Sequence, residues 1–533
     1  MKSNTIDVIT NASLNRRDFL KISGGAVCAM TLPDIGCATF SKKIPYIDYS
    51  RELVLKNCHV IDVEKGICLE NAFIQIDHGK IIAVDTTPFN EDKHSEVIDL
   101  GGHYVIPGMI DAHCHATLSS AFYLKMFQEY KHLFQQERNF RLCIESGVTT
   151  IRDVGSLQYS LQWFIDRIKN GHILGPRVIF CNGILNIKGG HPEVNPTDIN
   201  MFANYASFFI GNAMTNFETI DDLKIALEKN TQKASFIKLT VDNQSVFCKN
   251  NLSIPVYSDD HLSTIFNEAE KKDLPVVCHQ MSKWGFDRMS QYPVHSMEHM
   301  VSDAYISDKE AIKVAQKKIA IVPTLTVGQS YAFKELFPLV PKEYQTEFIE
   351  NEIDIKMQYL NKESSQHIDP SIHQQNLGMI AYYQKVPCSQ MWDQKIFMAY
   401  PDPMFGLLKY GVENLKKLKQ AGALIGCGMD AGVPLCYFGS LYRECELLSR
   451  VGFTNHEVLQ CATINNAKIL RMENSIGSIQ PGKYADLVVL NENPLKEIKS
   501  LRNPLIVMKD GQIMISKLPV HRNKQTRMLN LTL

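Results

Sequence analysis

Short apolar stretches alternate with amphipathic stretches through the middle of this 533-residue chain. Such alternation predicts parallel strands joined by helices, because a parallel connection has to cross back over the sheet. Eight such units over about 320 residues predict a (β/α)₈ barrel of the TIM type with insertions. The predicted strands cover residues 105–110, 149–152, 177–181, 236–239, 275–279, 294–299, 319–322 and 423–427, with helices predicted over 220–230 and 261–272 among others.

The two ends of the chain have a different pattern, made of short β-rich runs. One group follows residue 52, and another includes 485–490 and a hairpin over 506–515 that turns on Asp510-Gly511. Neither group has enough strands to bury a core alone. We therefore predict one small β-sandwich domain built from residues 46–104 and 473–520, flanking a barrel of residues 105–472. Residues 521–533 are predicted to be a tail.

A long segment at 328–400 interrupts the barrel pattern after the seventh predicted strand. It is rich in Gln, Tyr, Phe and Lys and contains a predicted helical run over 343–360. Inserted segments of this length at the catalytic face of a barrel are often functional. A lid and a contact between subunits of a homo-oligomer both fit this segment.

Composition excludes two classes of partner. The formal net charge is -1, with 45% hydrophobic and 21% charged residues, which is typical of a soluble globular protein. Because the chain has no basic excess, no field attracts nucleic acid or an anionic membrane surface. The fourteen cysteines form no Cys-x-x-Cys motif, and several lie in apolar runs as small buried side chains.

The N-terminus carries a recognisable targeting pattern. Asn15-Arg-Arg-Asp-Phe-Leu-Lys21 precedes an apolar run over 22–32 that is too short to span a bilayer. The order resembles a twin-arginine signal, so residues 1–45 are predicted to be an export signal and linker, with the Tat machinery as partner and a periplasmic location. An unstructured basic tail is the alternative. Cys37 fits a lipid-attachment site, although Asp34 stands where an apolar residue is usual.

Two histidines follow the first predicted barrel strand. His113 and His115 are two residues apart, so on a strand their side chains point the same way, while Cys114 points the other way. Two converging imidazoles can hold a metal ion such as zinc if other ligands join them. Alone, a His-x-His pair is weak evidence, because surface and core histidines also occur in such pairs.

Further side chains with ligand chemistry occur at the ends of later predicted strands, where barrel enzymes carry their chemistry. Each has a structural alternative: a solvated lysine, a core histidine or a helix N-cap aspartate. Together they predict a metal centre. They are Lys238 in the fourth strand, His279 and His299 at the ends of the fifth and sixth, and Asp430 after the eighth.

These motifs resemble the amidohydrolase superfamily, and within it the prolidase-like and imidazolonepropionase-related branch. The resemblance covers nearly everything from about residue 52 to 515 and departs at Pro192 and at the 328–400 segment. It rests on Pro107-Gly-Met-Ile-Asp-Ala-His-Cys-His115, Gly147-Val-Thr-Thr-Ile-Arg-Asp-Val-Gly155, Gly189-Gly-His191, Gly428-Met-Asp-Ala-Gly432, Ala462-Thr-Ile-Asn-Asn-Ala467 and Ile476-Gly-Ser-Ile-Gln-Pro-Gly-Lys-Tyr-Ala-Asp-Leu487.

The resemblance implies a centre with two divalent metal ions. His113, His115 and Asp430 would bind one ion, and His279 and His299 the other. Lys238 would bridge them after capturing carbon dioxide as a carbamate, because an ammonium group cannot ligate a cation. The nitrogen and oxygen ligands favour zinc.

The implied activity is hydrolysis of an amide (C–N) bond. A hydroxide bridging the metals would attack the scissile carbonyl, and Asp430 would act as the catalytic residue that passes the proton to the leaving amine. The branch suggests a dipeptide of the Xaa-Pro type or an N-acyl amino acid as substrate. The predicted protein is therefore a metal-dependent hydrolase and dipeptidase.

Alternative functions remain open at the level of sequence. A single-metal deaminase or cyclic-amide hydrolase of the same superfamily is the nearest, but its glutamate three residues after the fifth-strand histidine is replaced by Ser282. A lactonase or esterase would use the same ligands. A non-catalytic scaffold would be expected to have lost some of them.

Three residues are candidates for binding the substrate: His191 after two glycines, Arg152 after the second strand, and Tyr257 before a predicted helix. Structural alternatives exist for two of them. Tyr257 fits a hydrophobic staple for the helix that Ser258 would cap, and Arg152 fits a structural ion pair.

Overall fold

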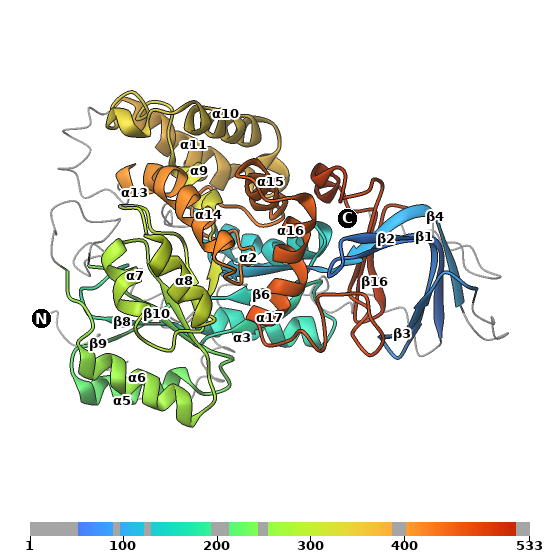
Figure 1. Cartoon of the computed structure of the whole chain (residues 1–533), viewed down its shortest axis with the longest axis horizontal. Helices are drawn as coiled ribbons and strands as arrows, with labels where there is room; N and C mark the ends of the chain where they lie inside the picture. The colour runs from blue at the N-terminus through green and yellow to red at the C-terminus, as the bar shows by residue number, and fades with distance from the viewer. Residues whose placement is uncertain are drawn as a thin grey trace, which may run out of the picture.

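The computed structural model describes residues 52–88, 96–121, 129–192, 213–243, 254–385 and 401–518. The predicted export signal, Cys37 and the predicted tail lie outside these ranges. A barrel forms the centre of the molecule, a sheet domain lies at one end, and helices of the inserted segment gather over one side of the barrel (Figure 1). Within the described ranges, no helix has the length and apolar character needed to cross a membrane.

The sheet domain combines strands from both ends of the chain, as predicted. Its single seven-stranded sheet has the order β16-β15-β14-β4-β1-β2-β3. A separate apolar core, including Leu55, Ile74, Val105 and Leu487, fills the domain. The strands are β1 (Leu53–Asp62), β2 (Ile67–Asp77), β3 (Lys80–Asp85), β4 (Glu96–Pro107), β14 (Leu487–Leu490), β15 (Ile506–Lys509) and β16 (Gln512–Ser516).

The strand predicted over 105–110 is divided between the two domains. β4 ends at Pro107, where it pairs with β14, and β5 (Met109–Cys114) begins the barrel. Gly108 joins them because a Cβ atom there would lie 2.1 Å from Thr149 Oγ1, so only glycine fits. The boundary between the domains therefore falls at Gly108 rather than after residue 104.

The barrel strands lie in two sheets, β5-β6-β7 and β13-β12-β11-β10-β8-β9. The predicted eighth strand, 423–427, closes the barrel. Ile321 N–H donates to Leu424 O at 2.9 Å and Ala112 N–H donates to Cys427 O at 3.0 Å, so this segment pairs with strands on both sides. The remaining strands are β6 (Val148–Asp153), β7 (Arg177–Phe180), β8 (Ile184–Ile187), β10 (Ile237–Thr240), β11 (Val276–His279), β12 (Ser296–Glu298) and β13 (Ala320–Val322).

The third barrel strand is interrupted, which the sequence pattern did not predict. β7 pairs with β6, and β8 pairs with β10, with residues 181–183 between them. Gly183 has a φ of 121°, a conformation that side chains disfavour, so the extended chain breaks there. β9 (Met214–Phe217) then adds an outer strand beside β8.

Helices cover the barrel strands from outside (Figure 1). Those predicted over 220–230 and 261–272 are present as α5 (Ile220–Asn230) and α6 (Asp259–Lys271), each begun by a capping box at Thr219 or Ser258. The others outside the insertion are α2 (Glu129–Glu145), α3 (Gln158–Lys169), α7 (Lys283–Met289), α8 (Asp308–Gln316), α14 (Val412–Gln420), α15 (Tyr442–Arg450), α16 (Asn455–Gln460) and α17 (Asn466–Ile469).

The inserted segment is helical in its described part and packs on the segment that follows the first barrel strand. Asn376 Nδ2 donates to Ser120 O at 2.8 Å, and Gln135 Nε2 donates to His367 O at 3.2 Å. These contacts place the insertion beside the carboxyl end of β5. Its helices are α9 (Leu325–Tyr331), which begins just before it, α10 (Glu347–Lys362) and α11 (Pro370–Lys385). Residues 386–400 lie outside the described residues, and α13 (Pro401–Gly406) follows the segment.

Candidate metal centre and active site

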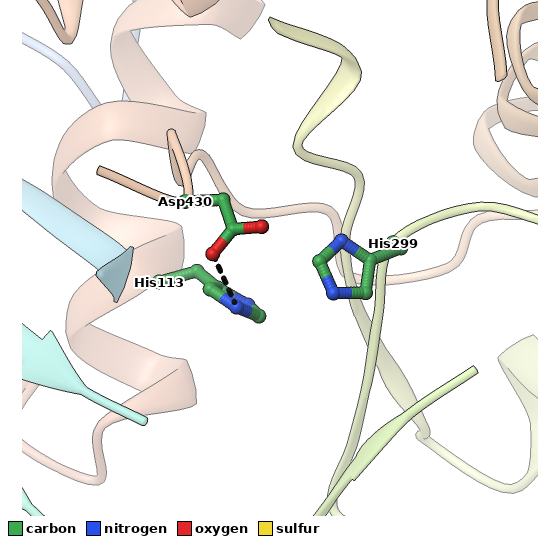
Figure 2. Close-up of side chains that lie close together, drawn as sticks. All are labelled: His113, His299 and Asp430. Carbon is green, nitrogen blue, oxygen red and sulfur yellow. Dashed lines mark ion pairs between the residues drawn. The ribbon is translucent and has the colours of Figure 1, made fainter. Parts of the chain in front are cut away.

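The end of β5 and the loop after the eighth strand position bring three predicted ligands into contact. Asp430 Oδ1 lies 3.0 Å from His115 Nε2 and 3.4 Å from His113 Nε2. Asp430 N–H donates to His113 O at 2.8 Å, so backbone pairing sets this approach. Figure 2 shows His113, His299 and Asp430 converging on one region.

Each of three histidines is held through its Nδ1 atom. His113 Nδ1 lies 2.7 Å from Glu298 Oε2, and His115 Nδ1 bonds the carbonyl of Gly155. His299 Nδ1 lies 2.6 Å from Thr324 Oγ1. A carboxylate or carbonyl partner requires the proton on Nδ1, which leaves the Nε2 lone pair for a metal.

Glu298 and Arg152 form an ion pair directly behind His113. Arg152 Nη2 donates to Glu298 Oε1 at 2.7 Å, Nε donates to Ala112 O at 2.6 Å, and Nη1 donates to Ser296 Oγ at 3.0 Å. Burial alone would raise the pKa of Glu298, but the Arg152 charge, the hydrogen bond with His113 and the nearby charges of His113 and Lys238 together outweigh it, so the pKa lies below its usual range. Arg152 is 1% exposed, and these contacts favour a structural ion pair over a contact with substrate.

Lys238 lies in the middle of β10, paired with Ile184 of β8 and Val277 of β11. Its side chain is 2% exposed, and its Nζ atom has no hydrogen-bond partner among the described residues. Burial lowers the pKa of Lys238, although the Glu298 charge opposes this shift. The amine therefore loses its proton more easily than a solvated lysine.

His279 and His299 extend the cluster on the other side. The His279 ring lies 4.4 Å from the His299 ring, which lies 4.8 Å from the His113 ring. His191 stacks on His279 at 4.6 Å. Burial lowers the pKa of both His279 and His299 well below the usual range, so both are neutral, which is the form that ligates metals.

Asp242 is a residue of this site that sequence reasoning missed. Its carboxylate accepts hydrogen bonds from Met281 N–H, Ser282 N–H and Ser282 Oγ, at 2.6 Å for the last, and so fixes the loop after His279. It lies 3.4 Å from His279 Nε2 without hydrogen-bond geometry. Burial raises the pKa of Asp242 to about 6. The sequence signal that could have identified Asp242 is its position two residues after the end of β10.

Tyr257 lies in the apolar core rather than beside the ligands. It is 1% exposed, its hydroxyl donates to the carbonyl of Leu185, and its ring lies 5.7 Å from Phe217. Ser258 caps α6, as expected. These contacts favour the structural alternative for Tyr257, whereas His191 does join the site.

The residues fit a metal ion. One ligand atom each from His113, His299 and Asp430 lie within 4.8 Å of one another. Lys238 Nζ and His279 Nε2 are buried without a hydrogen-bond partner among the described residues. Buried polar atoms are rarely left in this state, and a divalent cation satisfies nitrogen and oxygen donors gathered in this way.

The amidohydrolase family model matches residues 104–514. This chain belongs to the amidohydrolase family. Members of this family are metal-dependent hydrolases, and the cluster of His113, His299 and Asp430 fits that chemistry.

Among curated proteins, the chain is 29% identical to adenine deaminase 4 of Rhizobium meliloti over 86 residues, which is 16% of this chain and 14% of that protein. It is 41% identical to a dihydroorotase of Ruminiclostridium cellulolyticum over 64 residues, 12% of this chain and 14% of that protein. The matches therefore span only a small part of these relatives.

Among solved structures, a prolidase complexed with N-methylphosphonate-L-proline aligns with a TM-score of 0.64 at 22% identity, covering 87% of this chain and 99% of its own. A Xaa-Pro dipeptidase with bound methionine aligns with a TM-score of 0.64 at 20% identity, with the same coverage. At this identity the likeness establishes the fold, a barrel with a separate sheet domain.

Proposed function

We propose that this protein hydrolyses the amide bond of a dipeptide of the Xaa-Pro type or of an N-acyl amino acid, using two divalent ions, preferably zinc. The observation that carries the proposal is the buried amine of Lys238, which has no hydrogen-bond partner among the described residues, together with the neutral imidazoles of His279 and His299. A site for one ion needs no such amine. A site for two ions needs a bridging anion, which this amine can become.

Lys238 would become a carbamate by reaction with carbon dioxide. The neutral Nζ attacks the carbon of carbon dioxide, a new N–C bond forms, and one proton leaves the nitrogen. The product is a carbamate with one negative charge and two oxygen ligands. Burial lowers the pKa of Lys238 and so increases the fraction of nucleophilic neutral amine.

The proposed ligand sets are His113, His115 and Asp430 for one ion and His279 and His299 for the other, with modified Lys238 between them. When bound, the ions supply Lewis acidity and an activated water. Asp430, whose carboxylate lies 3.0 Å from His115 Nε2, would take up a proton from the attacking water and deliver it to the leaving nitrogen.

His191 supplies a polar contact for the substrate next to His279. Burial, with the neighbouring His279, lowers the pKa of His191 to about 3, so its imidazole is neutral at working pH. A neutral ring can donate or accept one hydrogen bond at a substrate oxygen but cannot balance the charge of a carboxylate. The substrate carboxylate therefore needs another contact.

A single-ion deaminase is the second candidate, because the His113, His299 and Asp430 atoms alone suffice for one ion and the short local matches include an adenine deaminase. Against it, Ser282 stands where those enzymes carry an acid. The Ser282 hydroxyl donates to Asp242 at 2.6 Å and accepts from Gly285 N–H at 3.0 Å. It is thus engaged in the loop and offers no proton.

The test is metal content by inductively coupled plasma mass spectrometry on the purified protein and on Lys238→Ala, beside hydrolysis of a dipeptide library and a panel of aminopurines. We expect about two ions per chain, fewer in the variant, and a carbamate signal in carbon-13 NMR after exchange with labelled carbon dioxide. One ion per chain, unchanged in Lys238→Ala and with activity on aminopurines, would establish the deaminase instead.

We also propose export through the twin-arginine route to the periplasm, on the sequence of residues 15–32 alone. Replacement of Arg16 and Arg17 by lysine should retain the protein in the cytoplasm. Cell fractionation of both forms checks this, and equal periplasmic amounts would contradict it.

A further inference from the structure

Asp242 lies beside His279 but outside the set of predicted ligands. Strand β10 ends at Thr240, which stands opposite His279 in the pairing with β11, and Val241 N–H donates to His279 O at 2.9 Å. This pairing places Asp242 just beyond the ends of the two strands. Asp242 Oδ2 and His279 Nε2 are 3.4 Å apart, so two atoms with ligand chemistry meet there.

The two atoms approach each other without satisfying each other. His279 Nε2 has no hydrogen-bond partner among the described residues. Asp242 is 6% exposed, and no lysine or arginine in the described part of the chain forms an ion pair with it. A buried carboxylate without a cationic partner is costly, because the charge has lost its water. A cation between the two atoms would satisfy both.

The spacing of the two atoms is that of two ligands of one zinc ion. Zinc binds imidazole nitrogen at about 2.0–2.1 Å and carboxylate oxygen at about 2.0–2.2 Å, so two such ligands of a tetrahedral ion lie about 3.3–3.5 Å apart. Asp430 Oδ1 and His113 Nε2, which belong to the other proposed ligand set, are also 3.4 Å apart. The Asp242 and His279 atoms thus repeat the spacing of a predicted ligand pair.

The hydrogen bonds of the Asp242 carboxylate leave part of one oxygen available. Oδ1 accepts from Ser282 N–H at 2.9 Å and from Ser282 Oγ at 2.6 Å. Met281 N–H is shared between Oδ1 at 3.2 Å and Oδ2 at 3.0 Å. Oδ2 has no other donor among the described residues, and a carboxylate oxygen has two lone pairs. A lone pair of the oxygen nearer His279 therefore remains.

The loop after β11 packs closely around this carboxylate. Ser282 Oγ also accepts from Gly285 N–H at 3.0 Å. A Cβ atom at Gly285 would lie 2.3 Å from Val241 O and 2.9 Å from Asp242 Oδ1, so the approach requires glycine. Metal ligands are commonly oriented by such hydrogen-bonded surroundings before the ion binds.

We propose that Asp242 is an additional ligand, through Oδ2, of the ion that His279 and His299 would hold. This assignment rests on the two-ion function proposed above. The ligand atoms that lie within 4.8 Å of one another, from His113, His299 and Asp430, do not include Asp242, so it belongs to the His279 side. Its carboxylate adds a negative charge to those of Asp430 and the carbamate, against the positive charge of two divalent ions.

The test is zinc affinity, measured by competition with a chromogenic chelator as the metal-free protein is reloaded. We expect about two ions per chain in the wild type. Asp242→Asn keeps an oxygen for the loop donors but removes the charge. It should weaken one ion by about 100-fold or more and change the other by less than about threefold. The visible absorption bands of the cobalt-loaded protein should also change, because they depend on the ligands of the ion.

Asp303→Asn is the matched control. Asp303 is exposed, and its Oδ1 accepts from Lys283 N–H of the same loop at 2.7 Å. The control therefore makes the same substitution at a carboxylate that also holds this loop. Both zinc affinities and the cobalt bands should stay as in the wild type.

Anomalous scattering at the zinc edge, from crystals of the zinc-loaded wild type, needs no variant. A zinc peak should lie about 2.0–2.2 Å from Asp242 Oδ2. No peak within about 3 Å of this oxygen, or equal zinc affinities in wild type and a folded Asp242→Asn, would overturn the proposal and leave the two-ion function intact. One ion per chain in the wild type would overturn the two-ion function, and this assignment with it.

Discussion

Lys238 and Lys356 are both almost completely buried, with 2% and 1% of their surface exposed, but their amines have different surroundings. Lys356 Nζ donates to Ala332 O at 2.6 Å and lies 4.8 Å from the centre of the Phe333 ring. Lys238 Nζ has no hydrogen-bond partner among the described residues. Burial lowers the pKa of both, that of Lys356 to about 7.

The difference separates a structural lysine from the lysine that we propose to be reactive. The amine of Lys356 has an acceptor within the insertion, so the protein itself stabilises it. The amine of Lys238 has ligand-type neighbours and no acceptor, so its environment is complete only when another group arrives. Burial and a lowered pKa alone would not have distinguished the two.

The largest effect is expected from substitution of Lys238, and its absence would contradict the distinction between the two lysines. Lys238→Met should lower kcat/KM for an amide substrate by about 10³-fold or more, because the proposed bridging ligand is lost. Lys356→Met should stay within about threefold, since the contacts that it removes, with Ala332 O and the Phe333 ring, lie inside the insertion. Steady-state kinetics on both variants, with circular dichroism as the check on folding, measures this. Similar losses in the two variants would remove the distinction.

The next effect concerns the neighbours of Lys238. Glu298→Gln should weaken metal binding by about 10–100-fold, because His113 loses the carboxylate that orients it. The variant should also lose about 3–5 kcal/mol of stability, since Arg152 is left buried without its counterion.

Competition with a chromogenic chelator gives the metal affinity of Glu298→Gln. Glu352→Gln is its control, because it unpairs Arg450 away from the metal centre and should keep wild-type metal affinity. Equal metal affinity in Glu298→Gln and wild type would show that His113 is positioned without the carboxylate.

The pH dependence of stability tests the comparison through the titration of Lys356. Its pKa is about 7 in the folded protein against 10.5 as the ordinary value, so between these pH values the unfolded chain binds the extra proton. The stability that this group contributes therefore rises with pH across that window, by up to about 1.4 kcal/mol per pH unit, and is lowest below pH 7.

Lys356→Met should accordingly exceed wild type in stability most near pH 7, with a difference that shrinks toward pH 10. Urea denaturation of both proteins at several pH values measures this. A difference that does not change with pH would mean that the folded state keeps Lys356 charged.

The smallest effect is expected from the hydrogen bond that Thr324 forms with His299. Thr324→Val removes the hydroxyl that bonds His299 Nδ1 at 2.6 Å and should weaken metal binding by about tenfold or less. Thr324→Ser keeps the hydroxyl and should restore the affinity. If the Ser variant is as weak as the Val variant, the backbone conformation of residue 324 matters more than the hydrogen bond.

Much of the site could be predicted from sequence because parallel strands in a barrel all end at one face. His113, His279 and His299 end three such strands, so their convergence follows from the strand pattern once each strand is located. The sheet domain could be predicted because each end of the chain has too few strands for a core. The metal-binding roles of the individual side chains stay predictions.

The partners behind the ligands could not be predicted. Strand alternation would place Glu298 and His299 on opposite sides, but His299 has a φ of 68°, so the strand turns there and both side chains reach the cluster. Glu298 meets His113 across 185 positions of sequence, a contact that no local pattern encodes. The division at Gly108 was missed for a similar reason, since Thr149, which forbids a side chain there, is distant in sequence.

The arrangement of β4 also sets when the site can be built during synthesis. β4 runs through Gly108 into β5, which ends beside His113, and in the sheet β4 lies between β1 and β14. β14 begins only at Leu487, and Gly108 N–H donates to Asp486 O at 2.7 Å. A growing chain can pair β1 with β4 early, but the other edge of β4 stays open until β14 has left the ribosome. The base of the first ligand-bearing strand is therefore completed last, so the metal centre is expected to mature after translation rather than during it.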